Sequence, residues 1–321
     1  MANESGRRII DTHFHIYPPN YTRTNLSRIV GDSLTFPASI FTSWTPQFAL
    51  EQMEKAGIAT AIASMTSPGI WFDDGAQAAR ARARECNEFG AQLKRDFPGR
   101  FGMFAAIPLP DTEGSLREIE YALDVLKLDG IGLLTSYETR LLGDSGFVPV
   151  FEEINRRKAA VFVHPTASCA NLMPGMGAPT IEFPTDTTRT IASLMFMGTA
   201  GRFRDIKFIF SHGGGTLAMV LQRFGRMVAK LTPEQRAQWM PNGFEAELKR
   251  QYYDLASIGA APIGMAAVLK LFPTTQLTYG SDVPYGSTTQ IADGIAALGL
   301  SERDLALIWR GNAARLFPQF A

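Results

Sequence analysis

Short apolar runs typical of buried strands alternate with longer amphipathic segments typical of helices, and this pattern occurs eight times along the chain. The strand-like runs lie at residues 8–14, 59–66, 101–109, 130–136, 159–165, 206–212, 251–257 and 276–283. The helical patterns lie at 45–56, 76–97, 112–127, 147–158, 186–199, 215–230 and 261–271, with two closing helices expected at 289–298 and 301–316. Eight such units favour an α/β fold of the (β/α)₈ TIM-barrel type over an open doubly wound sheet.

The series of units is not interrupted by a Gly/Ser linker, a charge block or a short-period repeat, so we expect one barrel domain over residues 1–321. The segments 17–44 and 166–185 are rich in Pro, Ser, Thr and Gly and are longer than ordinary barrel turns. We therefore expect both to be loop insertions beside the active site. Thr45, Pro46 and Gly57 are start and stop signals for the first outer helix.

The charge balance argues against nucleic acid and anionic membrane surfaces as partners, because Lys plus Arg and Asp plus Glu both number 31. A small molecule is the expected partner. Only two cysteines occur, Cys86 and Cys169, which disfavours a disulfide framework. The first residues lack the apolar stretch of a secretory signal, and no apolar run reaches membrane-spanning length, so we expect a cytoplasmic protein.

All four histidines fall at or near the carboxyl end of an expected strand: His13 and His15 on the first, His164 on the fifth and His212 on the sixth. In a barrel these strand ends meet around one mouth. Strand alternation sends residues i and i+2 to the same side, so His13 and His15 can both face the barrel axis.

Asp282 lies at the end of the eighth strand, which closes the barrel beside the first. Imidazole and carboxylate together suit Zn²⁺, Mn²⁺ or Fe²⁺, and an open position in such a set is typical of a catalytic centre. One histidine on a strand is most often a hydrogen-bonded core residue. The joint placement of all four at strand ends favours a metal site instead.

Other residues near these strand ends carry weaker signals. Asp11 shares the face of His13, and we expect it to orient a ligand rather than bind metal. The His-Gly-Gly-Gly run at 212–215 could bind an oxyanion through its amides, although such a run is more often a tight turn. Arg223, in the helix that follows, is equally well read as a solvated surface residue. No pattern assigns a role to four further side chains, which are Cys169, Tyr253, Asp254 and Ser257. For Cys169 we expect a structural thiol.

Four motifs resemble those of the decarboxylases in the amidohydrolase superfamily, above all the aminocarboxymuconate semialdehyde decarboxylase and 6-methylsalicylate decarboxylase groups. They are Asp-Thr-His-Phe-His at 11–15, Val-His-Pro at 163–165, Ser-His-Gly-Gly-Gly at 211–215 and Tyr-Gly-Ser-Asp-Val-Pro at 279–284. The stretches 44–58 and 183–188 are similar as well, so the resemblance spans nearly the whole chain. It implies an amidohydrolase-type barrel.

The resemblance also implies roles for individual residues. The metal ligands would be His13, His15, His164 and Asp282. The metal would be divalent, with zinc expected first and manganese as the alternative. His212 would act as acid and base beside a metal-bound water, and Arg223 would clamp a substrate carboxylate. In the family this arginine often reaches across a dimer interface, so we expect a homodimer or larger homo-oligomer, with the choice between cis and trans open.

The sequence departs from the family pattern in one informative place. The semialdehyde decarboxylase has a second carboxylate-binding arginine in the loop that corresponds to residues 33–44, and this chain has none there. A dicarboxylic substrate is therefore disfavoured, and an aromatic monocarboxylate fits Phe36, Phe41, Trp44 and Trp71 better. We expect Trp44 and Trp71 to bind substrate. The chain also lacks the Glu-rich first motif of the γ-resorcylate branch.

These observations lead to one hypothesis with one rival. The first is non-oxidative decarboxylation of an aromatic carboxylic acid that bears an ortho hydroxyl or similar group, with the proton delivered by Asp282 or His212. The rival is hydrolysis of an amide, ester, lactone or ring-cleavage product by an activated metal-bound water. The same ligands serve both reactions. A binding role without catalysis would require the metal site to be empty.

Overall fold

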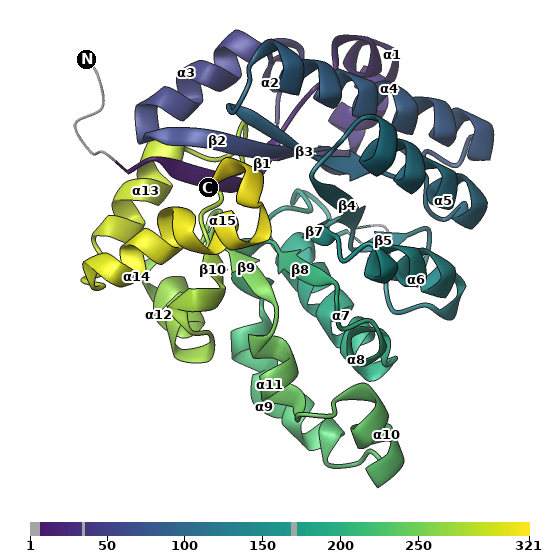
Figure 1. Cartoon of the computed structure of the whole chain (residues 1–321), viewed down its shortest axis with the longest axis vertical. Helices are drawn as coiled ribbons and strands as arrows, with labels where there is room; N and C mark the ends of the chain where they lie inside the picture. The colour runs from purple at the N-terminus through teal and green to yellow at the C-terminus, as the bar shows by residue number, and fades with distance from the viewer. Residues whose placement is uncertain (1–6, 34–35, 168–171) are drawn as a thin grey trace.

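The eight expected strands form one parallel sheet rolled into a barrel, as seen in the computed structural model, which describes residues 7–33, 36–167 and 172–321 (Figure 1). In spatial order the strands are β1 (Ile9–His15), β2 (Ile58–Ser64), β3 (Phe101–Ala106), β4 (Gly130–Leu134), β7 (Ala160–His164), β8 (Lys207–Phe210), β9 (Tyr252–Asp254) and β10 (Leu277–Thr278). Every neighbouring pair in this order is parallel. The expected barrel fold is therefore confirmed, and β3, β4 and the later strands are shorter than the sequence pattern suggests.

Backbone hydrogen bonds close the barrel between β1 and the segment that follows β10. The His15 amide donates to the Val283 carbonyl over 2.9 Å, and the Asp282 amide donates to the His13 carbonyl over 2.8 Å. The seam therefore ties Asp282 directly to the strand that carries two of the expected ligands.

A separate apolar cluster joins residues of five strands across the inside of the barrel. Its strand members are Ile10, Ile62, Phe104, Ala160, Phe162 and Ile209. Phe104 and Phe162 stack with their ring centroids 5.3 Å apart, and Phe317, near the C-terminus, meets Phe104 at 5.6 Å. Because the interior is filled by side chains, the strand ends rather than a central pore must hold any functional site.

Helices pack around the outside of the strands (Figure 1). Those that match the expected patterns are α3 (Pro46–Ala56), α4 (Ala76–Asp96), α5 (Thr112–Glu120), α6 (Val148–Arg156), α7 (Glu182–Phe196), α9 (Leu217–Val228), α12 (Pro262–Leu271) and α13 (Thr288–Ala296). The expected signals operate in α3: the Thr45 side chain accepts from the Phe48 amide, and Gly57 ends the helix with a φ of 76°.

The segment 17–44 was expected to be a loop, and that expectation is wrong over most of its length. It contains α1 (Pro19–Ser33) and α2 (Ala38–Thr42). Its polar composition obscured the helix, but Tyr21 and Ile29 are buried and anchor α1 to the body of the protein. Burial of one apolar face outweighs weak local propensity. In the segment 166–185, residues 168–171 lie outside the described residues, and α7 begins within it at Glu182.

Several short elements were not expected from the sequence. The hairpin strands β5 (Ser136–Tyr137) and β6 (Arg140–Leu141) follow β4, and helices α8 (Thr199–Arg202), α10 (Pro233–Trp239) and α11 (Phe244–Lys249) lie near α7 and α9 in the chain. The closing helix expected at 301–316 is divided into α14 (Glu302–Ala306), a π-helical turn at Leu307–Gly311 and α15 (Asn312–Leu316). These are local insertions and do not alter the barrel.

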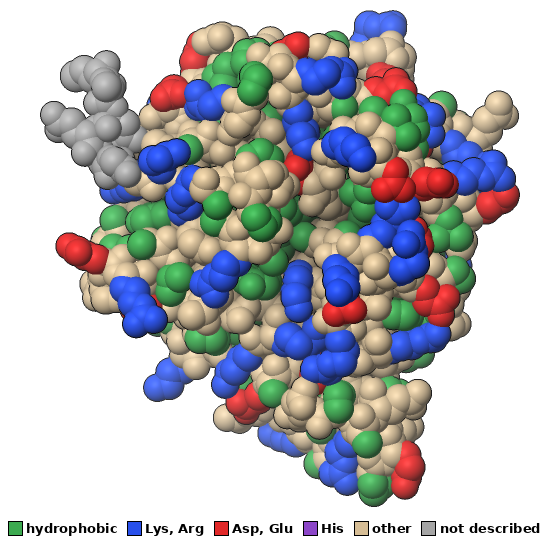
Figure 2. All heavy atoms as spheres, in the orientation of Figure 1, with side chains coloured by type: hydrophobic (Ala, Val, Ile, Leu, Met, Phe, Trp, Pro, Cys, Tyr) green, Lys and Arg blue, Asp and Glu red, His purple; other side chains and the backbone are tan. Residues whose placement is uncertain are grey.

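On the face drawn in Figure 2, basic and acidic side chains both occur over the surface, and no histidine is visible there. This view looks onto the side of the barrel where α15 lies (Figure 1). None of the helices in the described part of the chain combines the length and apolar character that a membrane span requires.

Asn87 on α4 should be essential for stability, because it binds both backbone groups of Ala106 at the end of β3. Its side chain donates to the Ala106 carbonyl and accepts from the Ala106 amide, each over 2.8 Å. Asn87→Ala would leave these buried groups unpaired, and we expect the free energy of unfolding to fall by roughly 2–4 kcal/mol. Denaturant unfolding measures this, with Gln92→Ala on the exposed face of α4 as the control. Equal midpoints for the two variants would contradict the assigned role.

Candidate metal centre

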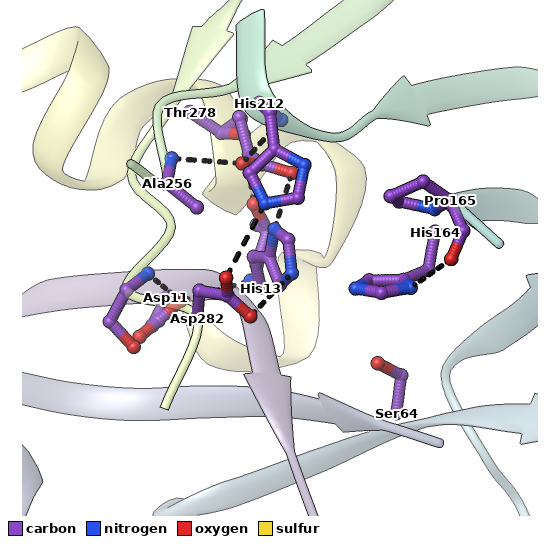
Figure 3. Close-up of polar contacts among 12 residues, drawn as sticks. Asp11, His13, Ser64, His164, Pro165, His212, Ala256, Thr278 and Asp282 are labelled. Carbon is purple, nitrogen blue, oxygen red and sulfur yellow. Dashed lines mark hydrogen bonds and ion pairs between the residues drawn. The ribbon is translucent and has the colours of Figure 1, made fainter. Parts of the chain in front are cut away.

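His13, His15, His164 and Asp282 converge at the carboxyl ends of β1 and β7 and just after β10. Their ligand atoms all lie within 4.8 Å of one another. In Figure 3, His164 approaches the centre from the side opposite Asp282, with His13 between them. The strand ends thus bring together the four residues named from the sequence.

An irregularity in β1 allows both of its histidines to face the centre. The pairing register with β2 shifts by one residue between Asp11 and Phe14. Ile10 therefore packs into the barrel interior while His13 and His15, further along the strand, still point toward its axis. The bulge re-aims the functional side chains without exposing the apolar layer beneath them.

The outward-facing ring nitrogens of the three histidines are held by partners outside the cluster. His13 Nδ1 donates to Asp254 Oδ2 over 3.0 Å, and His15 Nδ1 pairs with Ser64 Oγ at 3.2 Å. His164 Nδ1 donates to the carbonyl of the next residue over 2.8 Å. Partners of this kind fix the ring orientation and leave Nε2 for a metal ion.

The inward-facing atoms are unusually crowded for groups of this type. His13 Nε2 lies 3.1 Å from His15 Nε2, and Asp282 Oδ1 lies 3.3 Å from the first and 3.1 Å from the second. Both imidazoles are fully buried, and the Asp282 side chain is 13% exposed. A proton or a cation must lie among these atoms to balance their lone pairs, so the donor set fits a divalent metal ion with nitrogen and oxygen ligands.

The electrostatics of the cluster favour positive charge. Burial disfavours the imidazolium form of His13, but Asp254 and Asp282 outweigh it and raise the pKa of His13 to about 10. Burial lowers the pKa of His15 and, far more, that of His164. Burial also acts to raise the pKa of Asp282, yet His13 outweighs it and holds that pKa well below its usual range. Positive charge therefore belongs beside the ionised Asp282 carboxylate, carried either by His13 as an imidazolium or by a metal ion that replaces the His13 proton.

His212 lies beside this cluster but is not one of its four members. Its Nε2 is 3.4 Å from Asp282 Oδ2, and its buried Nδ1 has no hydrogen-bond partner among the described side chains and backbone groups. Both residues have left-handed backbones, with φ of 55° at His212 and 61° at Asp282. Such conformations are disfavoured for residues other than glycine and cluster at functional sites.

Asp254, which sequence reasoning left unassigned, is the organising carboxylate of the centre. One oxygen accepts from His13, and the other accepts from the backbone amides of His212 and Ala256 at 3.2 and 2.9 Å. Close packing at this point requires Gly280, since a Cβ there would lie 2.8 Å from His13 Cβ. The position of Asp254 at the end of the seventh strand was the available signal.

Asp11 and the glycine run have structural roles here. Asp11 Oδ1 accepts from the backbone amides of His13 and Ser281, so this carboxylate orients the strand and is not among the four ligands. Burial, its largest influence, raises the pKa of Asp11 to about 7. In the run 212–215, the amides of Gly214 and Gly215 donate to carbonyls within the turn, which supports the tight-turn interpretation.

A cavity of about 350 Å³ opens onto the metal centre. Two of the four cluster residues, His164 and Asp282, reach it, together with the neighbouring His212. Aromatic and aliphatic groups form much of the remaining wall, together with hydroxyl groups and one further carboxylate: Asp32, Phe36, Thr66, Ser67, Pro179, Thr180, Phe183, Pro184, Gly215, Ser257, Ile258 and Tyr285. This is a suitable size and character for a small aromatic molecule.

The structure does not bring the expected tryptophans to this cavity. Trp44 is 4% exposed and packs against Phe89, with ring centroids 6.0 Å apart. Trp71 lines a neighbouring cavity, and its indole donates to Asp73 over 3.0 Å. Phe36, Phe183 and Tyr285 provide the aromatic wall instead. Trp44 and Trp71 were expected because the chain lacks the second arginine of the semialdehyde decarboxylase, whereas their actual positions depend on how the chain packs around them.

The remaining candidates fall outside the metal centre. Arg223 is exposed on α9 and does not line the cavity. Ser257 does line it, and Tyr253 is a core residue that stacks on Phe272 with ring centroids 3.7 Å apart. Cys169 lies outside the described residues.

Comparison with known proteins agrees with this architecture. A decarboxylase of Aspergillus niger, yanB, is 36% identical over 338 residues, covering 97% of this chain and 88% of that protein. The 6-methylsalicylic acid decarboxylase of Penicillium expansum is 31% identical, covering 97% and 96%. The structure of 5-carboxyvanillate decarboxylase LigW2 from Novosphingobium aromaticivorans has the same fold, with a TM-score of 0.88 at 21% identity over 98% of both chains.

The resemblance noted in the sequence motifs is confirmed at the level of the family. The sequence pattern of the amidohydrolase family (Amidohydro_2) matches residues 10–319, which is nearly the whole chain. The four converging side chains come from the strand ends where that resemblance places its ligands. This chain belongs to the amidohydrolase family.

Proposed function

We propose that this protein catalyses the metal-dependent, non-oxidative decarboxylation of an aromatic carboxylic acid with a hydroxyl group ortho to the carboxylate. The observation that carries the proposal is the opening of the four-residue cluster onto a cavity walled by Phe36, Phe183 and Tyr285. The fungal relatives that match over 97% of the chain are named as decarboxylases, one of them for 6-methylsalicylic acid, an ortho-hydroxybenzoic acid.

His13, His15, His164 and Asp282 would hold the metal ion. When bound, a divalent cation would supply the positive charge that orients an ortho oxygen and a carboxylate and stabilises charge developing in the ring. Three imidazoles and one carboxylate fit zinc, which we propose first. Manganese is the alternative, because the LigW2 structure was determined with manganese bound.

His212 and Asp282 together are placed to supply the proton. The ring carbon that loses its carboxylate must gain a proton before the carbon–carbon bond breaks, and the bonding pair then restores the aromatic ring as CO₂ leaves. His212 Nε2 and Asp282 Oδ2 are 3.4 Å apart and both border the cavity, so the two can share and deliver one proton. The unpartnered Nδ1 of His212 can recover a proton afterwards.

We also propose a cytoplasmic homodimer in which Arg223 serves the neighbouring subunit. Helix α9 carries Met219 and Met227, 82% and 49% exposed, and α12, which packs against it, carries Ile263, 89% exposed. Exposed apolar side chains gathered on adjacent helices are typical of an interface. Arg223 lies on the same helix, is exposed and does not line its own cavity, so its guanidinium is suited to pair with a carboxylate in the partner's cavity.

The decarboxylase proposal is tested with the purified metal-loaded protein and a panel of acids. Salicylate-type acids should release CO₂ and give the corresponding phenol, whereas anilides and lactones should give no new carboxylate. Gas evolution and chromatography of the products measure both reactions. Hydrolysis without CO₂ release would instead support the rival activity, which uses the same ligands.

Removal of one ligand should abolish stoichiometric metal binding. We expect His15→Ala to lose the ion, because the variant lacks one of the four ligands and because Asp282 then contacts one histidine fewer. Asp254→Asn should retain the ion but bind it about 10–100-fold more weakly, because Asp254 orients His13 and is not itself one of the four ligands. Elemental analysis and competition with a chelator measure both effects and identify the metal. Full occupancy in His15→Ala would contradict the ligand assignment.

His212→Ala should separate metal binding from turnover. Because His212 lies outside the four-residue cluster, the variant should keep its metal while kcat falls by about 10²–10⁴-fold. Steady-state kinetics with elemental analysis on the same sample measures the two quantities. Metal loss with normal turnover after metal is restored would show that His212 acts on binding alone.

Arg223→Lys should raise KM strongly, because a point charge cannot replace the planar two-bond contact of a guanidinium. Arg226→Ala, on the same exposed helix, is the matched control and should leave KM unchanged. Mixed dimers of Arg223→Ala and His212→Ala subunits should regain one intact site if Arg223 acts in trans. No recovery in mixed dimers that are shown to form would refute the shared site.

A further inference from the structure

Asp32 introduces a second carboxylate into the cavity of the metal centre. It lies near the end of α1 and lines both this cavity and the neighbouring one of about 760 Å³, so it belongs to the wall between them. Burial raises the pKa of Asp32, although a hydrogen bond with Ser67 and the charge of Arg28 oppose this. A carboxylate in such surroundings is costly unless it has donors to bind.

The protein itself satisfies this carboxylate only partly. The hydroxyl of Ser67 acts on it but has a single proton and also donates to Thr166 Oγ1 over 3.0 Å, whereas a carboxylate offers about four acceptor positions. Arg28, one turn earlier on α1, lies 3.8 Å from Asp73 and lines only the neighbouring cavity. In the described ranges no Lys, Arg or His nitrogen lies within 4.0 Å of the Asp32 oxygens. Acceptor capacity therefore remains toward the cavity.

Tyr285 lies within electrostatic range of both carboxylates of the cavity. Burial raises its pKa, and the charges of Asp282 and Asp32 raise it further, so the phenol stays neutral. The Tyr285 hydroxyl is hydrogen-bonded to the Tyr17 hydroxyl, so it already has a partner within the cavity wall. Asp32 is thus not neutralised from this side either.

We propose that Asp32 selects the substrate by accepting a hydrogen bond from a hydroxyl or amino group on the ring, away from the carboxylate that is lost. This inference rests on the proposed function, in which the reacting carboxylate binds at the metal centre. Like charges repel, so Asp32 disfavours a substrate whose second acidic group points at α1. The preferred class is a hydroxy- or amino-substituted aromatic monocarboxylate, and dicarboxylates are excluded by charge.

The test compares wild type, Asp32→Asn, Asp32→Leu and the control Asp73→Asn, whose aspartate lines only the neighbouring cavity. Each metal-loaded protein is given matched salicylates that carry a hydroxyl or a methyl group meta or para to the carboxylate. We expect wild type and Asp73→Asn to prefer the hydroxyl member of at least one pair by about tenfold in kcat/KM. Asp32→Leu should abolish that preference with little change for the methyl member, and Asp32→Asn should reduce it.

A second series replaces the hydroxyl by another carboxylate. Wild type should reject this acid, and Asp32→Asn should improve its kcat/KM by about tenfold because the repelling charge is gone. Circular dichroism and metal content establish that each variant is folded and loaded. An unchanged hydroxyl-to-methyl ratio in Asp32→Leu overturns the proposal.

Calorimetric binding of the same acids separates this inference from the proposed function. If no acid loses CO₂, the decarboxylase proposal fails, and binding still decides the role of Asp32. A hydroxyl preference in binding that disappears in Asp32→Leu supports the role. Equal affinity for both members of every pair in wild type overturns it.

Discussion

The crowding of electron-rich groups at the mouth of the barrel is the constraint on which the rest of the site depends. Two ring nitrogens and a carboxylate oxygen lie 3.1–3.3 Å from one another in buried surroundings. Such an arrangement is stable only when positive charge occupies its centre. Asp254 increases the demand by adding a second carboxylate behind His13. The electrostatics of the cluster alone therefore indicate a cation site, without reference to any related protein.

The barrel supplies the rigidity that holds these groups together. The seam between β1 and the segment after β10 bonds the backbone of Asp282 to that of His13, so two ligands share one hydrogen-bonded frame. Beneath them Phe162 packs against the His13 ring, with centroids 4.9 Å apart, and fills the interior. A ligand set on strand ends above a packed layer loses little conformational freedom when an ion binds.

The barrel and the convergence of His13, His15, His164 and Asp282 were predictable because both follow from local patterns: strand-like runs, and polar side chains at their ends. Features that depend on long-range packing were not. Tyr21 and Ile29 make a helix of a segment whose composition suggests a loop, and that helix positions Asp32 beside the cavity. For the same reason Trp44, an obvious aromatic candidate, is buried away from the cavity. No periodicity along the chain reveals which side of such a helix faces a distant strand end.

The charges around the cavity also impose an order on binding. Asp282 borders the cavity as an ionised carboxylate. Asp32, from the N-terminal part of the chain, adds a second acidic side chain to the cavity wall. An anionic acid entering such a space is repelled by Asp282 until positive charge offsets that carboxylate. Metal affinity must therefore be high enough to keep the centre loaded before substrate arrives. The fully buried Asp254–His13 pair meets this need by orienting His13 in advance, so that selection among substrates is left to the cavity wall.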